Sequence, residues 1–389
     1  MYRIKTLNAI SPVGTDRLPA DLYEVGPEVA DPDALLLRSF VLAPEDIPAT
    51  VQAIARAGAG TNNIPVTACS ERGIPVFNTP GANANAVKEL VMAALFLAAR
   101  NIIPAAAFAH RLDGTASEMS SAVEAGKKAY VGFELPGRSL GVIGLGAIGV
   151  EVANAASALG MQVYGFDPQL TVDHALKLAP QVTRTTDLNQ LLSKSDIITV
   201  HVPLLPETTA LIGAEQFALM RPETVLVNFA RAPIVDEAAL VAALEEDRLR
   251  GYVCDFPSPA LNKRDRVVTL PHLGASTAEA EENCARMAAD ELRAWLEDGT
   301  IRNSVNFPNA ELARTAGTTR ICIVNRNIPN MVGQVSTLLA GAGLNIADLL
   351  NRSRGDLAYT LVDIDGKLPE EVREKISSIE GVLAVRVLR

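Results

Sequence analysis

The chain has 389 residues, of which 48% are hydrophobic and 21% are charged, and its formal net charge is −10. This length and composition predict a globular protein of two or three domains. Because the acidic residues are interspersed with basic ones, the charge pattern predicts no nucleic-acid partner and no anionic membrane surface as partner.

The four cysteines, Cys69, Cys254, Cys284 and Cys322, are widely separated, with no CxxC pair and no histidine at a ligand spacing. This pattern predicts neither a metal site nor a disulfide framework, and we interpret the four as small buried hydrophobic residues. No stretch has the apolar length of a signal peptide or of a membrane span. We therefore expect a cytoplasmic protein.

The first 80 residues predict a parallel sheet with crossover helices. Apolar runs at residues 4–7 and 34–37 are typical of buried strands, and residues 46–57 are expected to be helical. Arg38 follows the second run, and a glycine-rich turn covers residues 58–60. From the sequence, Arg38 is either a solvated surface charge or a ligand-binding residue, and the turn is either a plain connection or part of a binding site.

The centre of the chain is organised around residues 139–167, where a short apolar run, the turn GLGAIG and a helical segment follow one another. Gly144 permits a tight turn, Gly146 lets the backbone approach a pyrophosphate, and Gly149 lets the helix pack close to the strand. Asp167 ends the next predicted strand. Its carboxylate can accept hydrogen bonds from an adenosine ribose, which favours NAD over NADP.

Four further strands are expected in this domain, at residues 196–203, 224–229, 251–256 and 267–270. With helical segments between them, they complete a doubly wound nucleotide-binding fold of six parallel strands. A buried helix is expected at residues 85–99. A second long helix at residues 278–297, ended by Gly299, is expected to return the chain to the first lobe.

Residues 303–318 predict a linker, and the elements beyond it follow the order βαββαβ of a ferredoxin-like module of about 70 residues. Strands are expected at residues 320–324, 345–353, 357–364 and 382–388, and helices at residues 331–342 and 369–379. Asn325, Asn327 and Asn345 occupy turn-like positions in this module. Their side chains could bind a small amino acid, or asparagine could be present only because it tolerates turns.

Few residues could act as a base in hydride transfer, because the chain has four histidines. His110 and His174 are expected to be structural or solvated. His201 lies at a predicted strand end, and His272 follows a strand and a proline. Each of these two could line a site or serve as a structural histidine.

Arg231 ends another predicted strand, in the segment NFARAPIVDE. A guanidinium at this position can bind a planar carboxylate through two parallel N–H groups, a geometry that lysine cannot offer. The alternative is a helix-capping ion pair with Asp236 or Glu237.

The GLGAIG turn, the NxAR segment running into IVDE, and PHLGAST stand in an order that resembles the D-isomer-specific 2-hydroxyacid dehydrogenases from the first strand to the last. AGAGTNN and NTPGANANAVKEL look most like the members that oxidise 3-phosphoglycerate with NAD to 3-phosphooxypyruvate, the first step of serine synthesis. The C-terminal module is similar to an ACT domain. The resemblance implies an α/β fold in which a Rossmann-type, doubly wound NAD domain is inserted in a smaller flavodoxin-like substrate domain, followed by a ferredoxin-like (ACT) α+β domain.

The expected domain organisation follows from this resemblance. Residues 1–95 form the first part of the substrate-binding domain, residues 96–277 the NAD-binding domain, residues 278–306 the return helix, residues 307–318 a linker and residues 319–389 the regulatory module.

The resemblance also implies a role for individual residues. His272 would be the acid/base, and Arg231 would bind the substrate carboxylate and carbonyl. NAD would contact Gly144, Gly146, Ala147, Ile148, Gly149, Asp167, Phe229, Ala230, Arg231, Asp255, His272, Leu273, Gly274 and Ala275. The substrate phosphate would contact Arg38 and the backbone amides near Gly58, Ala59 and Gly60. L-Serine, the possible effector, would bind Asn325, Asn327 and Asn345 between two copies of the module in a homodimer or homotetramer.

The sequence departs from the family pattern in two places. The family usually has a glutamate four or five residues after the position matched by Asp255, where it pairs with the catalytic histidine, but residues 256–260 contain no carboxylate. Either Asp265 or Glu279 reaches His272, or the base works without a partner carboxylate, which is our hypothesis. In the module, Asn325 stands where one well-known form has a histidine.

Two other functions remain open from the sequence. One is a reductase of glyoxylate or hydroxypyruvate, whose substrate lacks the phosphate. The other is an NAD-sensing interaction protein with little turnover, which the missing glutamate would suit.

Overall fold

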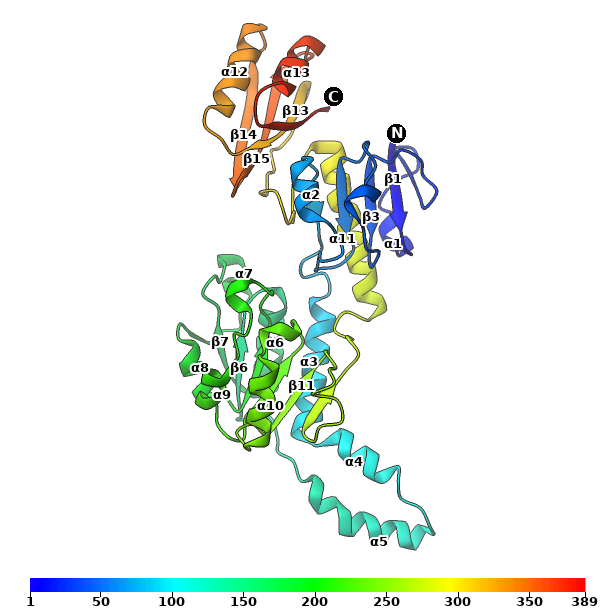
Figure 1. The fold of residues 1–389 in the computed structure, drawn as a ribbon, viewed down its shortest axis with the longest axis vertical. Coiled ribbons are helices and arrows are strands. Elements are labelled where there is room, and N and C mark those ends of the chain that lie inside the picture. The colour runs from blue at the N-terminus through cyan, green and yellow to red at the C-terminus, as the bar shows by residue number, and fades with distance from the viewer. Residues whose placement is uncertain (389) are drawn as a thin grey trace. The chain divides into compact units, whose positions relative to one another are not determined.

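The computed structural model describes residues 1–388. It divides into two compact units, each described by itself below. The discontinuous unit contains residues 1–83 and the residues from 278 onward, and the central unit contains residues 84–277. Figure 1 shows the helices and strands of both.

Helix α3 (Ala84–Ala99) confirms the predicted buried helix at residues 85–99. Val87, Val91 and Leu95 pack with strands of the central unit in one hydrophobic core. The division between the units therefore lies at the start of this helix, whereas the sequence placed a domain boundary at residue 95. The difference arises because an apolar helix belongs with the core that buries it, which the sequence alone does not identify.

The discontinuous unit begins with a five-stranded parallel sheet in the order β2-β1-β3-β4-β5. Its strands are β1 (Tyr2–Leu7), β2 (Tyr23–Gly26), β3 (Ala34–Leu37), β4 (Ala53–Arg56) and β5 (Val76–Phe77), with short helices α1 (Pro12–Thr15), η1 (Pro44–Asp46) and α2 (Val66–Glu71). Strands β1 and β3 confirm the predicted runs. The long helix α11 (Ala278–Asp298) returns the chain to this sheet, as predicted.

The predicted helix at residues 46–57 is wrong. After the short turn η1, the chain forms the buried strand β4 between β3 and β5. Ala53, Ile54 and Ala55 are fully buried there. The two alanines favour a helix by propensity, so burial between two neighbouring strands decides the structure.

The central unit is built on a seven-stranded parallel sheet in the order β12-β11-β10-β9-β6-β7-β8. Its strands are β6 (Ser139–Ile143), β7 (Gln162–Phe166), β8 (Thr183–Thr185), β9 (Ile197–Val200), β10 (Val225–Asn228), β11 (Gly251–Cys254) and β12 (Val267–Thr269). The helices between them are α6 (Ala147–Ala158), α7 (Val172–Lys177), α8 (Leu188–Lys194), η3 (Pro206–Thr208), α9 (Ala214–Leu219), η4 (Ala232–Ile234) and α10 (Glu237–Glu245). The six predicted strands are present, and the polar three-residue strand β8 was missed.

The order of the strands along the chain reverses between β6 and β9, the place where doubly wound sheets bind nucleotides.

Two helices of the central unit, α4 (Ile102–Ala109) and α5 (Ala116–Gly126), contain no buried residue. The short helix η2 (Lys127–Tyr130) follows them. In Figure 1, α4 and α5 extend away from the sheet of their own unit. Within residues 1–388, no individual helix meets the length and hydropathy expected of a membrane span, although the bent pair α3 and α4 meets them when taken together.

The C-terminal module (residues 318–388) is a four-stranded antiparallel sheet in the order β14-β15-β13-β16, covered by two helices. Its elements are β13 (Thr318–Arg326), α12 (Met331–Gly341), β14 (Ile346–Arg354), β15 (Leu357–Asp365), α13 (Glu370–Ser377) and β16 (Val382–Leu388). Both the βαββαβ order and the ferredoxin-like topology are confirmed.

Both faces of strand β13 are buried. Ile321 and Ile323 pack beneath the module's helices, whereas Cys322 and Val324 belong to a core that includes Trp295 of α11. Arg320, fully buried, donates to both carboxylate oxygens of Asp363 at 2.7 Å and to carbonyl groups at the end of α11 and in the linker. The ion pair lies within the module, whereas the carbonyl contacts of Arg320 form only while the module stays docked on α11 and the linker.

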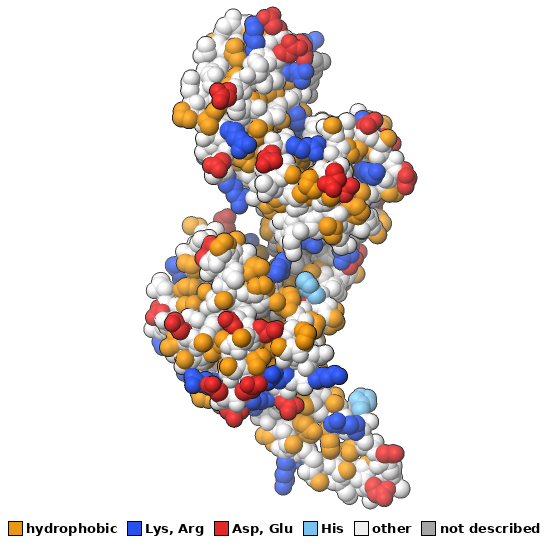
Figure 2. All heavy atoms as spheres, viewed as in Figure 1, with side chains coloured by type: hydrophobic (Ala, Val, Ile, Leu, Met, Phe, Trp, Pro, Cys, Tyr) orange, Lys and Arg blue, Asp and Glu red, His pale blue; other side chains and the backbone are white. Residues whose placement is uncertain are grey.

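All four cysteines are buried and unpaired, as expected. Burial raises the pKa of the Cys69 thiol to about 11 and raises the pKa of each of the other three thiols. The thiols therefore stay protonated near neutral pH and serve as packing residues. Figure 2 shows acidic and basic side chains interspersed over the visible face.

Glu291 of helix α11 makes the stability of the discontinuous unit depend on pH. Its side chain is buried, Oε1 accepts from Asn303 Nδ2 at 2.7 Å, and Oε2 has no partner among residues 1–388. Burial raises the pKa of Glu291 from its ordinary 4.5 to about 8. Since the folded protein holds this proton more tightly than the unfolded chain, we expect stability to fall as pH rises from about 4.5 to about 8.

Glu291→Gln keeps the shape of the side chain and the neutral charge of its protonated form. We therefore expect the variant to lose the fall in stability between about pH 4.5 and about pH 8. Urea unfolding from pH 5 to about pH 9 measures the free energy of unfolding of both proteins. Glu279→Gln, the same change at an exposed position of α11, is the matched control. Equal slopes of stability against pH in the wild type and in Glu291→Gln would contradict the assignment.

Candidate active site

The glycine turn after β6 has the geometry that its three glycines predict. Gly144 has a φ of 91°, and a Cβ on it would lie 2.7 Å from the carbonyl oxygen of His201. A Cβ on Gly149 would overlap the carbonyl oxygen of Gly144, whereas a Cβ on Gly146 would meet no atom within 4 Å. Two glycines therefore allow tight packing, and Gly146 faces open space that a ligand can approach.

Asp167, at the end of β7, fixes this turn. One carboxylate oxygen accepts from the backbone N–H of Leu145 at 2.9 Å, and the other accepts from that of Gln169 at 2.8 Å. Each oxygen has a further lone pair for a ribose hydroxyl. Helix α6 starts at Ala147, and the first N–H groups of a helix have no partner within it. The open approach, the helix start and the acceptor all fit a dinucleotide with an unmodified ribose.

Arg231 follows the end of β10 and is held through its backbone by Asn228. The fully buried Asn228 donates from Nδ2 to the Arg231 carbonyl at 2.9 Å and accepts at Oδ1 from the Ala230 N–H at 3.0 Å. The half-buried Arg231 side chain donates one N–H to the Ala230 carbonyl at 2.7 Å. It forms no ion pair within the described chain, and Asp236 instead caps helix α10. The other guanidinium N–H groups are available for a carboxylate.

His272 sits on a loop that Asp255 holds in place. Asp255 is 1% exposed, and its two oxygens accept from the backbone N–H groups of Leu273 and Gly274, each at 2.8 Å. His272 has a φ of 57°, an uncommon conformation for a residue with a side chain. Its ring contacts the Phe256 ring edge-on, with centroids 5.4 Å apart. The loop thus presents an exposed imidazole in a defined position.

No carboxylate is hydrogen-bonded or ion-paired to the imidazole of His272 within residues 1–388. Asp265, one of the two acids considered from the sequence, is exposed. Glu279, the other acid considered, belongs to the discontinuous unit, so the hypothesis of a base without a partner carboxylate stays a prediction.

The remaining histidines have other surroundings. His201 Nε2 lies 2.9 Å from Thr199 Oγ1, and its Nδ1 is buried without a partner among the described residues. Burial lowers the pKa of His201 to about 3, so this ring stays neutral at physiological pH. His110 and His174 are exposed or half-exposed at helix ends. None of the three has the setting of a proton-transfer group.

In the discontinuous unit, Arg38 and Arg56 follow or end the adjacent parallel strands β3 and β4. Arg56 Nε donates to the Arg38 carbonyl at 3.1 Å, and the Arg56 guanidinium lies against Gly58. Arg38 forms a half-exposed ion pair with Glu281 of α11 at 2.5 Å. Two arginines on adjacent strands thus lie at the same edge of the sheet, with the Arg56 side chain against the Arg38 backbone.

The turn that follows β4 offers further donors. The backbone N–H groups of Ala59, Gly60 and Thr61 donate no hydrogen bond within the described residues, whereas the Gly58 N–H donates to Arg56. Successive unpaired amides beside arginines form a concave anion-binding site. The structure therefore brings the predicted residues Arg38, Gly58, Ala59 and Gly60 together.

The three asparagines of the C-terminal module do not come together in one copy. Asn325 pairs with Ala358 across the sheet, and Asn327 donates to the Gly355 carbonyl. Asn345 instead donates to Asp365 at the other end of β15. Residues 358 and 365 are seven positions apart, or about 23 Å along a strand. A site containing all three asparagines would need two copies of the module.

The side chains of the other predicted cofactor residues differ in exposure. Phe229 belongs to the hydrophobic core and can offer a ligand only its backbone, whereas Leu273 is 41% exposed. Ala147, Ile148, Ala230 and Ala275 are half-buried, and Gly274 is buried.

Two site residues were missed from the sequence. Arg56 was not singled out, although it precedes the glycine turn just as Arg38 follows a strand, and this shared position was the available signal. Asn228 was noted only as part of the NxAR segment. Its role depends on buried hydrogen bonds that residue order does not reveal.

Comparison with known proteins gives a consistent result. Residues 93–274 match the family described as D-isomer specific 2-hydroxyacid dehydrogenase, NAD binding domain. The chain is 34% identical over 340 residues to D-3-phosphoglycerate dehydrogenase of Haemophilus influenzae, covering 85% of this chain and 79% of that protein. It is 32% identical over 376 residues to the enzyme of that name from Escherichia coli K12, covering 92% and 88%.

Among solved structures, the NAD+-bound 3-phosphoglycerate dehydrogenase of Entamoeba histolytica superposes with a TM-score of 0.61 at 26% identity. The superposition covers 78% of this chain and 98% of that one. The expected α/β fold with a nucleotide-binding domain is confirmed.

The loop geometry makes Asp255 a positioning residue whose loss should lower the catalytic rate. Asp255→Asn keeps one acceptor oxygen and replaces the other by a donor facing a backbone N–H, so one of the two anchoring bonds is lost. We expect kcat to fall about 10- to 100-fold, the usual effect of removing a hydrogen bond to a charged group. Asp265→Asn, the same change in an exposed acid, should leave kcat within about twofold.

Steady-state kinetics, with circular dichroism to confirm folding, measures both variants. Equal losses in the two variants, or no loss in Asp255→Asn, would contradict a positioning role for Asp255.

Proposed function

The chain belongs to the D-isomer-specific 2-hydroxyacid dehydrogenases, and from this premise we propose that it oxidises 3-phospho-D-glycerate to 3-phosphooxypyruvate with NAD. In cells this reaction would be the first step of L-serine synthesis. The proposal for the substrate is supported above all by one observation, the meeting of Arg38, Arg56 and the unpaired amides of residues 59–61.

A phosphate monoester carries close to two negative charges and three acceptor oxygens near neutral pH. Two guanidinium groups and adjacent backbone N–H groups match both its charge and its geometry. Glu281 pairs with Arg38 in the free protein and would give up this ion pair to the phosphate. A plain 2-hydroxy acid has no group that needs this set of donors.

The residues of the central unit supply the groups that the reaction needs. Arg231 would bind the substrate carboxylate through its available N–H groups and hold the hydroxyl-bearing carbon in place. His272 would remove the hydroxyl proton as general base. NAD, when bound, accepts the hydride from the same carbon, so that the alcohol is oxidised to a ketone as NAD is reduced. Gly144, Gly146, Gly149 and Asp167 would hold the cofactor.

A second copy of the chain is the partner we propose, as a homodimer or homotetramer. Helices α4 and α5 bury none of their residues within one chain. Ile102, Ile103 and Val123 are each at least 40% exposed on them. Covering apolar side chains of this kind would stabilise an oligomer. We place the enzyme in the cytoplasm, which keeps thiols reduced, in agreement with its four unpaired cysteines.

We propose that L-serine acts as effector at Asn325, Asn327 and Asn345 of an ACT-like module. Asn325 Oδ1 is buried without a partner among residues 1–388, so it can accept from an ammonium group. The sheet register makes the site dependent on two copies of the module. Feedback inhibition by the end product of the pathway would reduce the rate when serine is plentiful.

Arg38→Ala tests the substrate. We expect the KM for 3-phosphoglycerate to rise about 10- to 100-fold, because a charge-assisted contact to the phosphate is lost. The KM for unphosphorylated hydroxypyruvate or glyoxylate, measured in the reducing direction, should hardly change. Arg17→Ala, which likewise removes an arginine that is ion-paired with a carboxylate of α11, is the control.

An equal effect of Arg38→Ala on both kinds of substrate would contradict the phosphate assignment. Higher kcat/KM for the unphosphorylated acids in the wild type would favour a glyoxylate or hydroxypyruvate reductase. Stoichiometric NAD binding without turnover would favour a sensing protein.

Titration with L-serine tests the effector. We expect the rate to fall with saturation and heat of binding to be released, with D-serine inactive at the same concentration. Asn325→Ala and Asn345→Ala should each abolish both effects, because the two residues act from different copies. Unchanged rate and no heat on addition of L-serine would remove this part of the proposal.

A further inference from the structure

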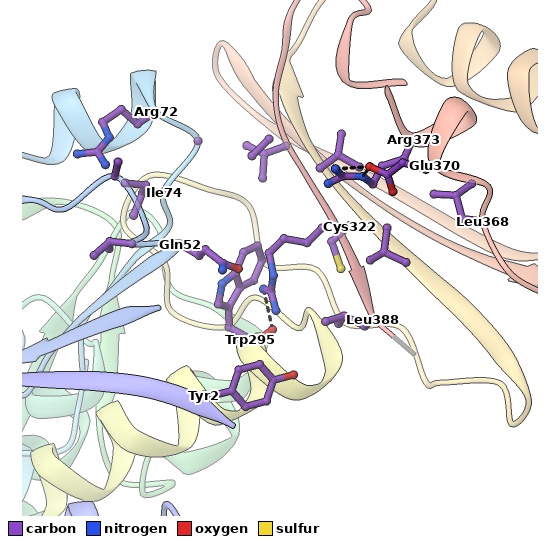
Figure 3. A pocket seen from close by; sticks show the side chains of 18 residues that line it. Tyr2, Gln52, Arg72, Ile74, Trp295, Cys322, Leu368, Glu370, Arg373 and Leu388 are labelled. Atoms are coloured by element: carbon purple, nitrogen blue, oxygen red, sulfur yellow. Dashed lines mark hydrogen bonds and ion pairs between the residues drawn. The ribbon is translucent and has the colours of Figure 1, made fainter. Parts of the chain in front are cut away.

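The discontinuous unit contains a second candidate site, whose lining includes none of the proposed phosphate-binding residues. A cavity of about 790 Å³ lies between the edge of the five-stranded sheet and strand β16 with the start of α13 (Figure 3). Its volume lies within the range of small-molecule sites. The glycine turn after β4 and Arg38 do not line it.

The charge of the cavity lining is positive. Arg72, Arg373 and Arg386 contribute three guanidinium groups, and Glu370 contributes one carboxylate, which leaves two positive charges. Arg373 is paired with Glu370. Arg72 and Arg386 form no ion pair among the described residues.

Arg72 and Arg386 are held in place by backbone carbonyl groups. Arg72 donates to the carbonyls of Ile47 and Pro48. Arg386 lies over the indole ring of Trp295 at 4.7 Å and donates to the carbonyls of Trp295 and Leu296 at the end of α11. A guanidinium has five N–H donors, so each arginine keeps donors for a ligand while its position is fixed.

Trp295 provides an independent observation. This residue is 1% exposed and lines the cavity, yet its Nε1–H has no hydrogen-bond partner among residues 1–388. Buried indole N–H groups normally have an acceptor. The missing partner is therefore an acceptor atom, as the oxygens of an anion would provide. Figure 3 shows Trp295 and Arg373 among the labelled side chains around the cavity.

We propose that this cavity binds a small organic dianion, recognised through carboxylate or phosphate oxygens. Two oxygens of a carboxylate or of a phosphate match the forked donors of arginine, and two negative charges balance the lining. Ile74, Leu368 and Leu388 give the rest of the cavity an apolar character that suits a short carbon skeleton. This site differs from both the proposed phosphate site and the proposed serine site in its residues.

The test uses Trp295, the only tryptophan of the chain, as a built-in probe. The full-length protein is titrated with succinate and, separately, with inorganic phosphate up to about 10 mM, tenfold above a millimolar dissociation constant. We expect a saturable change in tryptophan fluorescence with at least one of them. Response to succinate alone identifies carboxylate recognition, and response to phosphate alone identifies phosphate recognition.

Two variants that change the charge of the cavity lining in opposite directions provide the control. Arg373→Gln should weaken binding about two- to fivefold, because the side chain is partly exposed, and Glu370→Gln should tighten it by a similar factor. Both residues lie on the surface of α13, so both variants should fold. Arg38→Gln should leave the affinity unchanged.

No saturable fluorescence change with either anion would overturn the proposal. So would a response that Arg38→Gln abolishes, since the anion would then be bound at the proposed substrate phosphate site. Equal affinities in Arg373→Gln and Glu370→Gln would also contradict it.

Discussion

The proposed chemistry of this protein depends on one buried carboxylate. Asp255 directly follows strand β11 and accepts from two consecutive backbone N–H groups of the loop that carries His272. This pair of bonds holds the histidine at a positive φ that it would seldom adopt in a free loop. Asn228 does the same for Arg231 at the next strand. Buried polar side chains thus fix the backbone, and the reacting side chains remain available to substrate.

Much of the fold could be predicted from the sequence, because most strands are apolar runs and the glycine turn has few structural alternatives. The exceptions have physical reasons. The two alanines of strand β4 predict a helix, and only burial between two neighbouring strands decides for a strand. Strand β8 is three residues long and polar, with no apolar run to reveal it. The docking of the C-terminal module depends on hydrogen bonds from Arg320 to backbone carbonyls of α11 and the linker, which residue order does not reveal.

The candidate site could be predicted where it depends on strand ends, because the carboxyl ends of parallel strands lie at one edge of a sheet. The sequence predicts Arg38, Arg231 and His272 as site residues in this way, and their roles stay predictions. Arg56 and Asn228 were missed because their roles arise from hydrogen bonds to backbone groups that only the fold brings close. The ion pair of Arg38 with Glu281, 243 residues away, is equally invisible in the sequence.

The most direct test of the account is a crystal structure with NAD and 3-phosphoglycerate bound. The account predicts a ring nitrogen of His272 within about 2.6 to 3.2 Å of the substrate hydroxyl oxygen. It also predicts that the substrate carboxylate contacts the Arg231 guanidinium and that the substrate phosphate contacts Arg38 and Arg56. A substrate bound with its phosphate away from both arginines, or with its hydroxyl out of reach of His272, would contradict it.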